Sequence, residues 1–285
     1  MKATTRLRDL LQEGMVVAPG IYDGLSGKLV SMAGFDAAYA SGGAIARSSG
    51  VPDLNLVDLT QNVSRLEQIV DAAEIPIIAD LDTGYGNALN AQRAARAFER
   101  VGVAGFHIED QMFPKRCGHY DDKSLVAKAE FVQKVKAVKD ALHDPDFVVV
   151  ARTDAIAVEG FEAALDRAHA YAEAGADVVF VEAPATEEQI ERVARELPYP
   201  KLINMFYGAK TPLVPLERLR ELGYAIVIIP SDLQRAAIKA MQRTLEVIRR
   251  EGNSGSINDE LASFKERELI VDTAAYLERD SKYAS

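Results

Sequence analysis

The sequence predicts an α/β protein whose parallel strands close into a (β/α)8 TIM-type barrel, followed by a C-terminal helical extension. Eight short runs rich in Val, Ile and Ala alternate with segments of helical period along the chain. The runs are continuously apolar, which is typical of strands that are buried on both faces. Alternation of strands and helices indicates a parallel sheet, and eight strands close this type of barrel. A doubly wound open sheet is the alternative.

The strands are expected at the apolar runs, in chain order. These runs are residues 15–18, 37–40, 75–79, 104–108, 147–151, 178–181, 201–203 and 225–229. Before the sixth run, Leu165, Ala168 and Ala172 follow helical spacing, and Gly175 then ends the predicted helix. The same order of helix, glycine, short loop and buried strand recurs before three other runs, which supports a regular barrel.

The chain is expected to form a single domain with two parts. Residues 1–230 are predicted to be the barrel core, and residues 231–285 a C-terminal helical segment. A long helix is predicted over residues 232–250, and the Gly- and Ser-rich residues 252–256 interrupt it. Helix-forming residues return over 259–267, in a polar segment suited to packing on a neighbouring molecule.

Composition and charge favour a soluble cytoplasmic protein. The 285 residues carry 33 basic and 43 acidic side chains, a net charge of −10, which argues against nucleic acid as a partner. The apolar runs are much shorter than the roughly 20 residues of a membrane helix, so no membrane partner is expected. Cys117 is the only cysteine, which excludes an intramolecular disulfide framework and fits a reducing compartment.

Carboxylates follow the predicted third and fourth strands, at the end of a barrel where functional groups gather. Asp80 and Asp82 lie two residues apart, so their side chains share a face, and Glu109 follows the next strand. Two such close charges repel unless a cation lies between them, and oxygen ligands suit Mg²⁺ or Mn²⁺. Asp53 would converge on the same rim. A helix cap or loop salt bridge is the alternative for these acids.

Two further strand ends offer groups that bind anions. Ser41, Gly42 and Gly43 follow the second strand, where glycines allow a ligand to approach consecutive backbone N–H groups. Arg152 ends the fifth strand and is placed to clamp a carboxylate bidentately. A plain turn explains the first feature equally well. A salt bridge from Arg152 to Asp154 or Glu182 explains the second.

A reactive cysteine is predicted in the motif Lys115-Arg116-Cys117-Gly118-His119. Neighbouring cations favour the thiolate, and this cysteine lies outside any apolar run. Gly118 permits the backbone conformations of a loop that closes over substrate. His119 is a candidate general acid or base, or it orients its neighbours. His107 is as readily a packed histidine as a catalytic one.

These motifs resemble the isocitrate lyase/phosphoenolpyruvate mutase superfamily, and the likeness runs through most of the chain, from residue 22 to residue 212. The motifs that carry the likeness, besides 115–119, are Ser41-Gly42-Gly43, Gly50-Val51-Pro52-Asp53, Asp80-Leu81-Asp82-Thr83-Gly84-Tyr85-Gly86-Asn87, His107-Ile108-Glu109-Asp110-Gln111, Ala151-Arg152-Thr153-Asp154-Ala155 and Phe180-Val181-Glu182-Ala183. Their order and spacing agree together, which makes the likeness specific. Within the superfamily, the 115–119 type of motif is typical of the lyases and of one mutase.

The resemblance implies a fold, an assembly and a ligand set. It implies a modified barrel whose last helix is exchanged between subunits, in a homotetramer built as a dimer of helix-swapped dimers. It implies Mg²⁺ held mainly by Asp80 and Asp82, with Asp53 and Glu109 reaching the ion through water. The ligand set for a small carboxylate substrate would be Ser41, Gly42, Gly43, Arg116, Gly118, Arg152, Glu182 and Asn204.

The reaction that fits this set is a retro-aldol cleavage of a small 2-hydroxy di- or tricarboxylate, such as 2-methylisocitrate or 2,3-dimethylmalate. Tyr39 is a candidate for the base that takes the hydroxyl proton, or for its relay. Cys117 is assigned as the acid that protonates the enediolate. Lys115, Arg116 and His119 would neutralise the developing charge.

One segment departs from the patterns compared. After the seventh strand the sequence reads Asn204-Met205-Phe206-Tyr207-Gly208, and Tyr207 stands where one lyase and mutase pattern has an acidic residue. This segment is expected to contact the far end of the substrate, so the departure leaves the identity of the substrate undecided. Two other enzyme activities are alternatives to the lyase: a phosphonate P–C bond mutase, and an oxaloacetate hydrolase or decarboxylase. A non-enzymatic binding or structural protein on a barrel scaffold is the remaining alternative.

Overall fold

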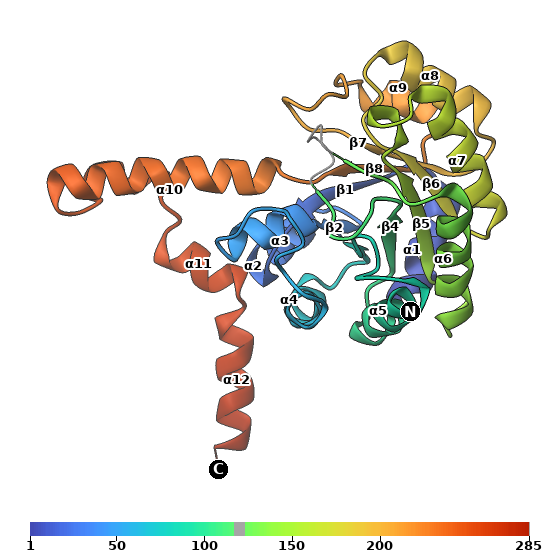
Figure 1. Cartoon of the computed structure of the whole chain (residues 1–285). Coiled ribbons are helices and arrows are strands. Elements are labelled where there is room, and N and C mark those ends of the chain that lie inside the picture. The colour runs from blue at the N-terminus through green and yellow to red at the C-terminus, as the bar shows by residue number, and fades with distance from the viewer. Residues whose placement is uncertain (117–122, 285) are drawn as a thin grey trace. The chain divides into compact units, whose positions relative to one another are not determined.

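The computed structural model describes residues 1–116 and 123–284, and within them eight parallel strands close into a barrel in chain order (Figure 1). The strands are β1 (Val16–Ile21), β2 (Ala38–Ala40), β3 (Ile77–Asp80), β4 (Gly105–Glu109), β5 (Val148–Thr153), β6 (Val178–Val181), β7 (Lys201–Asn204) and β8 (Ile226–Ile229). The barrel prediction is confirmed, and each predicted apolar run overlaps one strand, although several strands extend past the carboxyl end of the run. Pairing of β8 with β1 closes the sheet, which excludes the open-sheet alternative.

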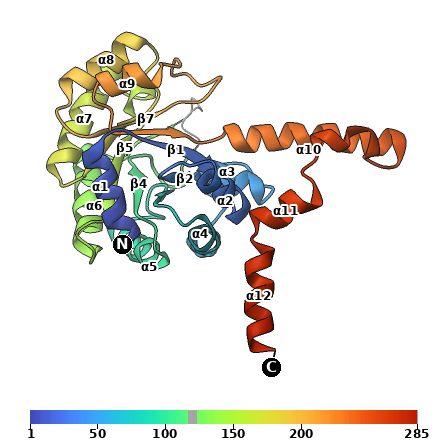
Figure 2. The same ribbon diagram turned by 180° about the vertical axis from the view of Figure 1, so that it is seen from behind.

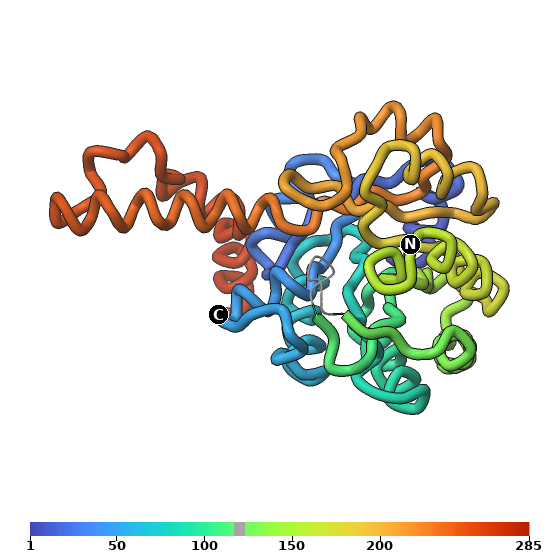
Figure 3. The backbone as a smooth tube through the Cα atoms, turned by 45° about the horizontal axis from the view of Figure 1, so that its top comes forward, coloured from blue at the N-terminus to red at the C-terminus, as the bar shows by residue number. Residues whose placement is uncertain are grey.

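Helices cover the outside of the barrel, and in Figure 3 the colour runs round this ring in chain order. They are α2 (Gly24–Met32), α3 (Gly42–Ser48), α4 (Leu59–Ala73), α5 (Ala88–Val101), α6 (Lys128–Ala141), η1 (Ala155–Ala157), α7 (Phe161–Glu173), α8 (Glu187–Glu196) and α9 (Leu216–Glu221). Side-chain caps start several of them, with capping boxes at Asp23, Asp58 and Asn87. Gly102 and Gly175 follow α5 and α7 with positive φ, as the predicted helix endings require.

The amino end of the barrel, where the strands begin, contacts α1 (Ala3–Glu13), which lies on the near side in Figure 2. Leu7 of α1 is fully buried and belongs to the same core cluster as Val148. Arg8 donates to the carbonyl oxygens of Asp146 and Phe147, just before β5 begins. This contact fixes the amino end of the barrel and leaves the carboxyl end for function.

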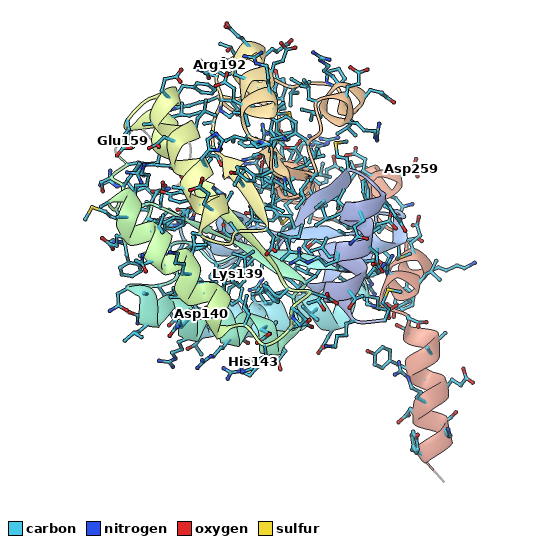
Figure 4. All side chains as sticks on the ribbon, turned by 90° about the vertical axis from the view of Figure 1, so that its right-hand side faces the viewer. Lys139, Asp140, His143, Glu159, Arg192 and Asp259 are labelled. Atoms are coloured by element: carbon cyan, nitrogen blue, oxygen red, sulfur yellow. The ribbon has the colours of Figure 1, made fainter. Side chains whose placement is uncertain are left out.

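The inside of the barrel changes from apolar to charged along the strands. In β5, Val148 and Val150 share a face with Arg152, because strand side chains alternate. β6 has the same pattern, with Val178 and Phe180 in the core cluster inside the barrel. Charged side chains on the outer helices, such as Asp140 of α6 and Arg192 of α8, lie at the surface instead (Figure 4).

The chain divides into two compact units, Met1–Asp232 and Leu233–Ser285. The second contains most of α10 (Asp232–Glu251), then η2 (Gly255–Glu260), α11 (Phe264–Ile270) and α12 (Thr273–Tyr283). The helix expected over 232–250 is confirmed. The helix formers at 259–267 divide between η2 and α11, because Ser263 caps a new helix through a capping box with Glu266. Among the described residues, no helix is long and apolar enough to span a membrane.

Candidate active site

Five of the predicted site residues end neighbouring strands and are buried at the carboxyl end of the barrel. They are Asp80, Glu109, Arg152, Glu182 and Asn204, on or directly after β3 to β7. The sheet register places Asp80 beside His107 and Glu109 beside Arg152. Strand alternation therefore brings together the groups that the sequence places at strand exits.

Arg152 is held by carboxylates before any ligand arrives. Its Nε and Nη2 donate to the two oxygens of Asp154, at 2.9 and 3.0 Å, and its Nη1 lies 3.2 Å from Glu182 Oε2. Burial alone would lower the pKa of Arg152, but Asp154, Glu182 and Glu109 raise it well above its usual value. In this structure the carboxylate that Arg152 binds bidentately is that of Asp154, two residues along the chain.

Several buried acceptors at the carboxyl end of the barrel lack a hydrogen bond. Among the described residues, Glu109 Oε1, both carboxylate oxygens of Glu182 and Asn204 Oδ1 have no hydrogen-bond partner. Burial raises the pKa of Glu109 well above its usual value, although the charge of Arg152 opposes this. Unpaired buried acceptors cost free energy, so this cluster is suited to a ligand that brings donors or a cation.

Lys115 joins two of the predicted metal-binding carboxylates. Its Nζ lies 2.7 Å from Asp53 Oδ1 and 2.8 Å from Asp82 Oδ1, and all three side chains are buried. Burial alone would lower the pKa of Lys115, but Asp82 and Asp53 raise it well above its usual value. Burial raises the pKa of Asp82 to about 7 against the charge of Lys115, with Asp80 and Asp53 adding to the rise. Lys115 therefore stays positively charged and offsets the negative charge of Asp53 and Asp82.

The chemistry of this donor set fits a hard divalent cation. Asp80 and Asp82 supply carboxylate oxygens, and Glu109 adds a buried oxygen without a hydrogen bond. Burial opposes ionisation of Asp80, but His107, Lys115 and Arg152 lower its pKa to about 2. The fit is one of ligand type and not of position: in the part of the chain that the structure describes, no three His, Cys, Asp or Glu side chains lie close enough together to hold a metal ion. Asp53 reaches the same rim, where Lys115 Nζ joins its carboxylate to that of Asp82.

Tyr39 and His107 form a buried pair beside Asp80. Tyr39 Oη lies 2.7 Å from His107 Nε2, and 3.4 Å from Asp80 Oδ2. His107 Nδ1 has no hydrogen-bond partner among the described residues, so a proton on Nε2 leaves no buried donor unpaired. Nε2–H then donates to Tyr39, and the Tyr39 hydroxyl donates toward Asp80. Burial lowers the pKa of His107 to about 4, which keeps the ring neutral near pH 7.

Burial also affects Tyr39 itself. Burial, and next the charge of Asp80, raise the pKa of Tyr39 well above its usual value. The hydroxyl therefore keeps its proton unless a ligand changes the local charge. This favours the relay role among the two roles expected for Tyr39.

The Ser41–Gly43 segment begins α3, with Ser41 as its N-cap. A Cβ atom on Gly42 would lie 2.6 Å from Asp80 Oδ2, which is closer than real contacts allow. A Cβ on Gly43 would lie 3.0 Å from Asp53 Oδ2. The glycines are therefore needed for the backbone to approach the carboxylates, whether or not the backbone N–H groups bind an anion.

The motif at 115–119 is described only in part, because Cys117, Gly118 and His119 lie outside the described residues. The main chain of Arg116 is fixed by Gln111, whose side chain accepts from the Arg116 N–H at 3.0 Å and donates to its carbonyl at 2.9 Å. Tyr207, in the segment that departs from the compared patterns, is 72% exposed.

Two residues of this region were not predicted. Asn55 contacts Asp82 and the main chain of Lys115, and Lys123 Nζ donates to Asp154 Oδ1 at 2.8 Å. Asn55 lies two residues after Asp53, in a left-handed conformation that asparagine tolerates, which is a weak signal in the sequence. Lys123 carries no such signal, because its partner is 31 residues away.

Comparison with known proteins agrees with this geometry. The family model described as phosphoenolpyruvate phosphomutase matches residues 7–249. A 2,3-dimethylmalate lyase from Eubacterium barkeri is 40% identical over 287 residues, covering 100% of this chain and 99% of the relative. A 2-methylisocitrate lyase from Aeropyrum pernix is 40% identical, covering 97% of this chain and 89% of the relative.

Solved structures give the same result. A crystal structure of 2,3-dimethylmalate lyase superposes with a TM-score of 0.93 at 35% identity, covering 99% of this chain and 95% of that one. A phosphonopyruvate hydrolase in complex with oxalate and Mg²⁺ superposes with a TM-score of 0.91 at 30% identity, covering 100% of both chains. The chain is therefore an enzyme of the phosphoenolpyruvate mutase/isocitrate lyase superfamily.

Proposed function

We propose that this enzyme is a Mg²⁺-dependent carbon–carbon lyase that cleaves a small 2-hydroxy di- or tricarboxylate, with 2,3-dimethylmalate and 2-methylisocitrate as the first candidates. The observation that carries the proposal is Arg152, a buried cation beside the carboxylates of Glu109 and Glu182, at the barrel end where buried acceptors of Glu109, Glu182 and Asn204 make no hydrogen bond. A 2-hydroxy acid brings a carboxylate for the cation and a hydroxyl donor for the acceptors. Relatives at 40% identity act on such acids by name.

Mg²⁺ is the proposed cofactor, with Mn²⁺ as the alternative. Asp80 and Asp82 would hold the ion, and Asp53 and Glu109 would reach it through water. Bound there, the ion would acidify the substrate hydroxyl and stabilise the negative charge that develops on the reacting oxygens. The support is the oxygen-only donor set and the Mg²⁺ named in the phosphonopyruvate hydrolase structure.

Binding and proton removal use residues of the barrel interior. Arg152, with the backbone of Ser41, Gly42 and Gly43, would orient the carboxylate next to the hydroxyl-bearing carbon. Tyr39 would take up the hydroxyl proton while its own proton passes to Asp80, toward which its hydroxyl donates, and His107 would hold the Tyr39 oxygen in place. Glu182 Oε1 and Asn204 Oδ1 would accept hydrogen bonds from the substrate, because neither has a hydrogen-bond partner among the described residues.

Cleavage then breaks the bond between C2 and C3. The electron pair of that bond moves onto the second carboxylate as an enediolate, while the hydroxyl carbon becomes the carbonyl of a 2-keto acid. Cys117 would donate a proton to C3 and complete the leaving carboxylate. Lys115, Arg116 and His119 would offset the charge of the intermediate, and Gly118 would allow the chain to adapt around it. From 2,3-dimethylmalate the products are pyruvate and propionate.

We further propose that the C-terminal helices are exchanged between subunits of a homotetramer. Large apolar side chains are exposed along the second unit, and α11 and α12 bury none of their residues. The exposed set includes Met241, Leu245, Phe264, Tyr276 and Leu277. Contact with a second copy of the chain would cover them. The cytoplasmic location stays a prediction.

A parallel assay for keto acids tests the proposed reaction. The enzyme with Mg²⁺ is offered 2,3-dimethylmalate, 2-methylisocitrate, isocitrate and oxaloacetate, each with an EDTA control. Metal-dependent release of pyruvate or glyoxylate from a hydroxy acid supports the lyase. Turnover of oxaloacetate alone assigns a decarboxylase or, if oxalate forms, a hydrolase. If none of the four acids reacts, phosphonopyruvate is offered next, and its turnover assigns the phosphonate chemistry. Turnover of oxaloacetate alone or of the phosphonate alone contradicts the lyase.

A further inference from the structure

The side chain of Asn55 connects two other loops of the active site. Asn55 lies between α3 and α4, and its Nδ2 donates to Asp82 Oδ2 at 3.2 Å. Its Oδ1 accepts from the backbone N–H of Lys115 at 2.5 Å. The amide of Asn55 therefore hydrogen-bonds to a carboxylate after β3 and to the main chain after β4. These two partners lie 27 and 60 positions away in the sequence.

The two residues that Asn55 contacts also contact each other. Lys115 Nζ lies 2.8 Å from Asp82 Oδ1, and it reaches back to Asp53, two residues before Asn55. Asn55 thus fixes the main chain of Lys115 while the ammonium group of Lys115 pairs with the acids. The second oxygen of Asp82 is held by Asn55, so both oxygens of that carboxylate have a fixed contact.

The backbone of Asn55 explains why this position can hold such a group. Its φ of 57° lies in the left-handed region, which asparagine and glycine adopt more readily than other residues. Glycine would satisfy the backbone but contact nothing. Aspartate has a similar shape, but its carboxylate could not donate to Asp82 and would repel it. An amide is the group that donates and accepts at once.

We propose that Asn55 is a positioning residue for the reaction, holding Asp82 and the main chain of Lys115 in one arrangement. This inference rests on the proposed function, in which Asp82 and Lys115 serve turnover. Asn55 touches neither Arg152 nor the Ser41–Gly43 segment in any hydrogen bond of the described residues, so its loss should affect the rate more than substrate binding.

The test compares Asn55→Gly and Asn55→Asp with the wild type and with a matched control, Glu74→Gly. Glu74 also has a left-handed φ, 56°, but is exposed at the end of α4. For each protein, kcat and KM are measured on the acid that the wild type cleaves, along with the thermal midpoint. Trypsin cleavage after Lys115 is followed by mass spectrometry, relative to cleavage after Lys265.

The proposal expects Asn55→Gly to lower kcat by about 10- to 100-fold, with KM within about threefold and the protein still folded at the assay temperature. Asn55→Asp should be slower than Asn55→Gly, because it places a second carboxylate against Asp82. Cleavage after Lys115 should become about two- to tenfold faster in both variants. Glu74→Gly should match the wild type throughout.

A purely structural asparagine gives a different pattern. Asn55→Gly would then keep the wild-type kcat and trypsin rate, which overturns the proposal, as does an aspartate variant faster than the glycine one. The trypsin comparison needs no substrate. If the wild type turns over none of the acids, the proposed function fails, while unchanged cleavage after Lys115 independently overturns the contact assigned to Asn55.

Discussion

Tyr39 Oη lies 2.7 Å from His107 Nε2, and both side chains are buried inside the barrel. This contact joins the second strand to the fourth next to Asp80. The imidazole is neutral near pH 7, because burial lowers its pKa to about 4. The pair therefore connects the proposed proton relay to the acid stability of the fold.

The low pKa of His107 predicts a pH-dependent stability. Since the folded-state pKa is about 4 and the unfolded value about 6.5, the unfolded chain binds more protons between these values. The contribution of His107 is complete above pH 6.5 and is lost as the pH falls toward 4. The free energy of unfolding, measured in urea with EDTA, should fall by about 3 kcal/mol more across this window than in His107→Gln. Parallel pH curves for the two proteins would show that folding does not lower the pKa of His107.

Lys115→Met should destabilise the fold and abolish turnover. It leaves Asp53 and Asp82 buried without the ammonium group between them, which costs about 3–5 kcal/mol when one partner of a buried pair is removed. Urea denaturation measures the loss. Lys128→Met is the matched control, because Lys128 pairs with Asp166 at the surface and should cost less than about 1 kcal/mol. Equal losses in the two variants would contradict the buried pairing.

Gly42→Ala should remove activity while the protein stays folded. The new Cβ would lie 2.6 Å from Asp80 Oδ2, so the carboxylate must move away from its position. We expect kcat/KM to fall by about 100-fold or more. Gly14→Ala is the control, since no atom lies within 4 Å of its Cβ position. An alanine at 42 with full activity would show that Asp80 is not held there during turnover.

Arg152→Lys should weaken both binding and rate. A lysine cannot form the two parallel bonds to Asp154 that fix the arginine, and it leaves Glu182 without its nearby cation. We expect kcat/KM to fall by about 100-fold, since losing a buried charge-assisted contact costs about 2–5 kcal/mol. Steady-state kinetics on the cleaved acid provides the measurement, and an unchanged KM would argue against a substrate-binding role.

Much of the fold follows from local sequence pattern. The eight strands are predictable because strands buried on both faces have continuous apolar runs. The side chains at the strand ends are also predictable, because alternation along a strand points every second side chain into the barrel. Asp80, Glu109 and Arg152 were found in this way. The contacts of Lys115, Asn55 and Lys123 could not be predicted, because they join loops that are distant in sequence and depend on side-chain reach.

The helix ends show the same division. Gly175 predicts the end of α7 by its own backbone preference. The break between η2 and α11 depends on how Ser263 caps a new helix, which composition over residues 259–267 does not indicate. For Arg152 the sequence allows either a bound substrate carboxylate or a salt bridge to Asp154 or Glu182. It does not indicate which of these partners lies near the guanidinium.

The most direct test of the lyase is the fate of 2,3-dimethylmalate in D₂O, followed by NMR with Mg²⁺ present. Retro-aldol cleavage predicts equal amounts of pyruvate and propionate, with one deuterium at C2 of the propionate, delivered by the acid assigned to Cys117. Cys117→Ser should slow this release by orders of magnitude while substrate binding is kept. Release without deuterium, or no cleavage of this acid or of 2-methylisocitrate, would contradict the proposed function.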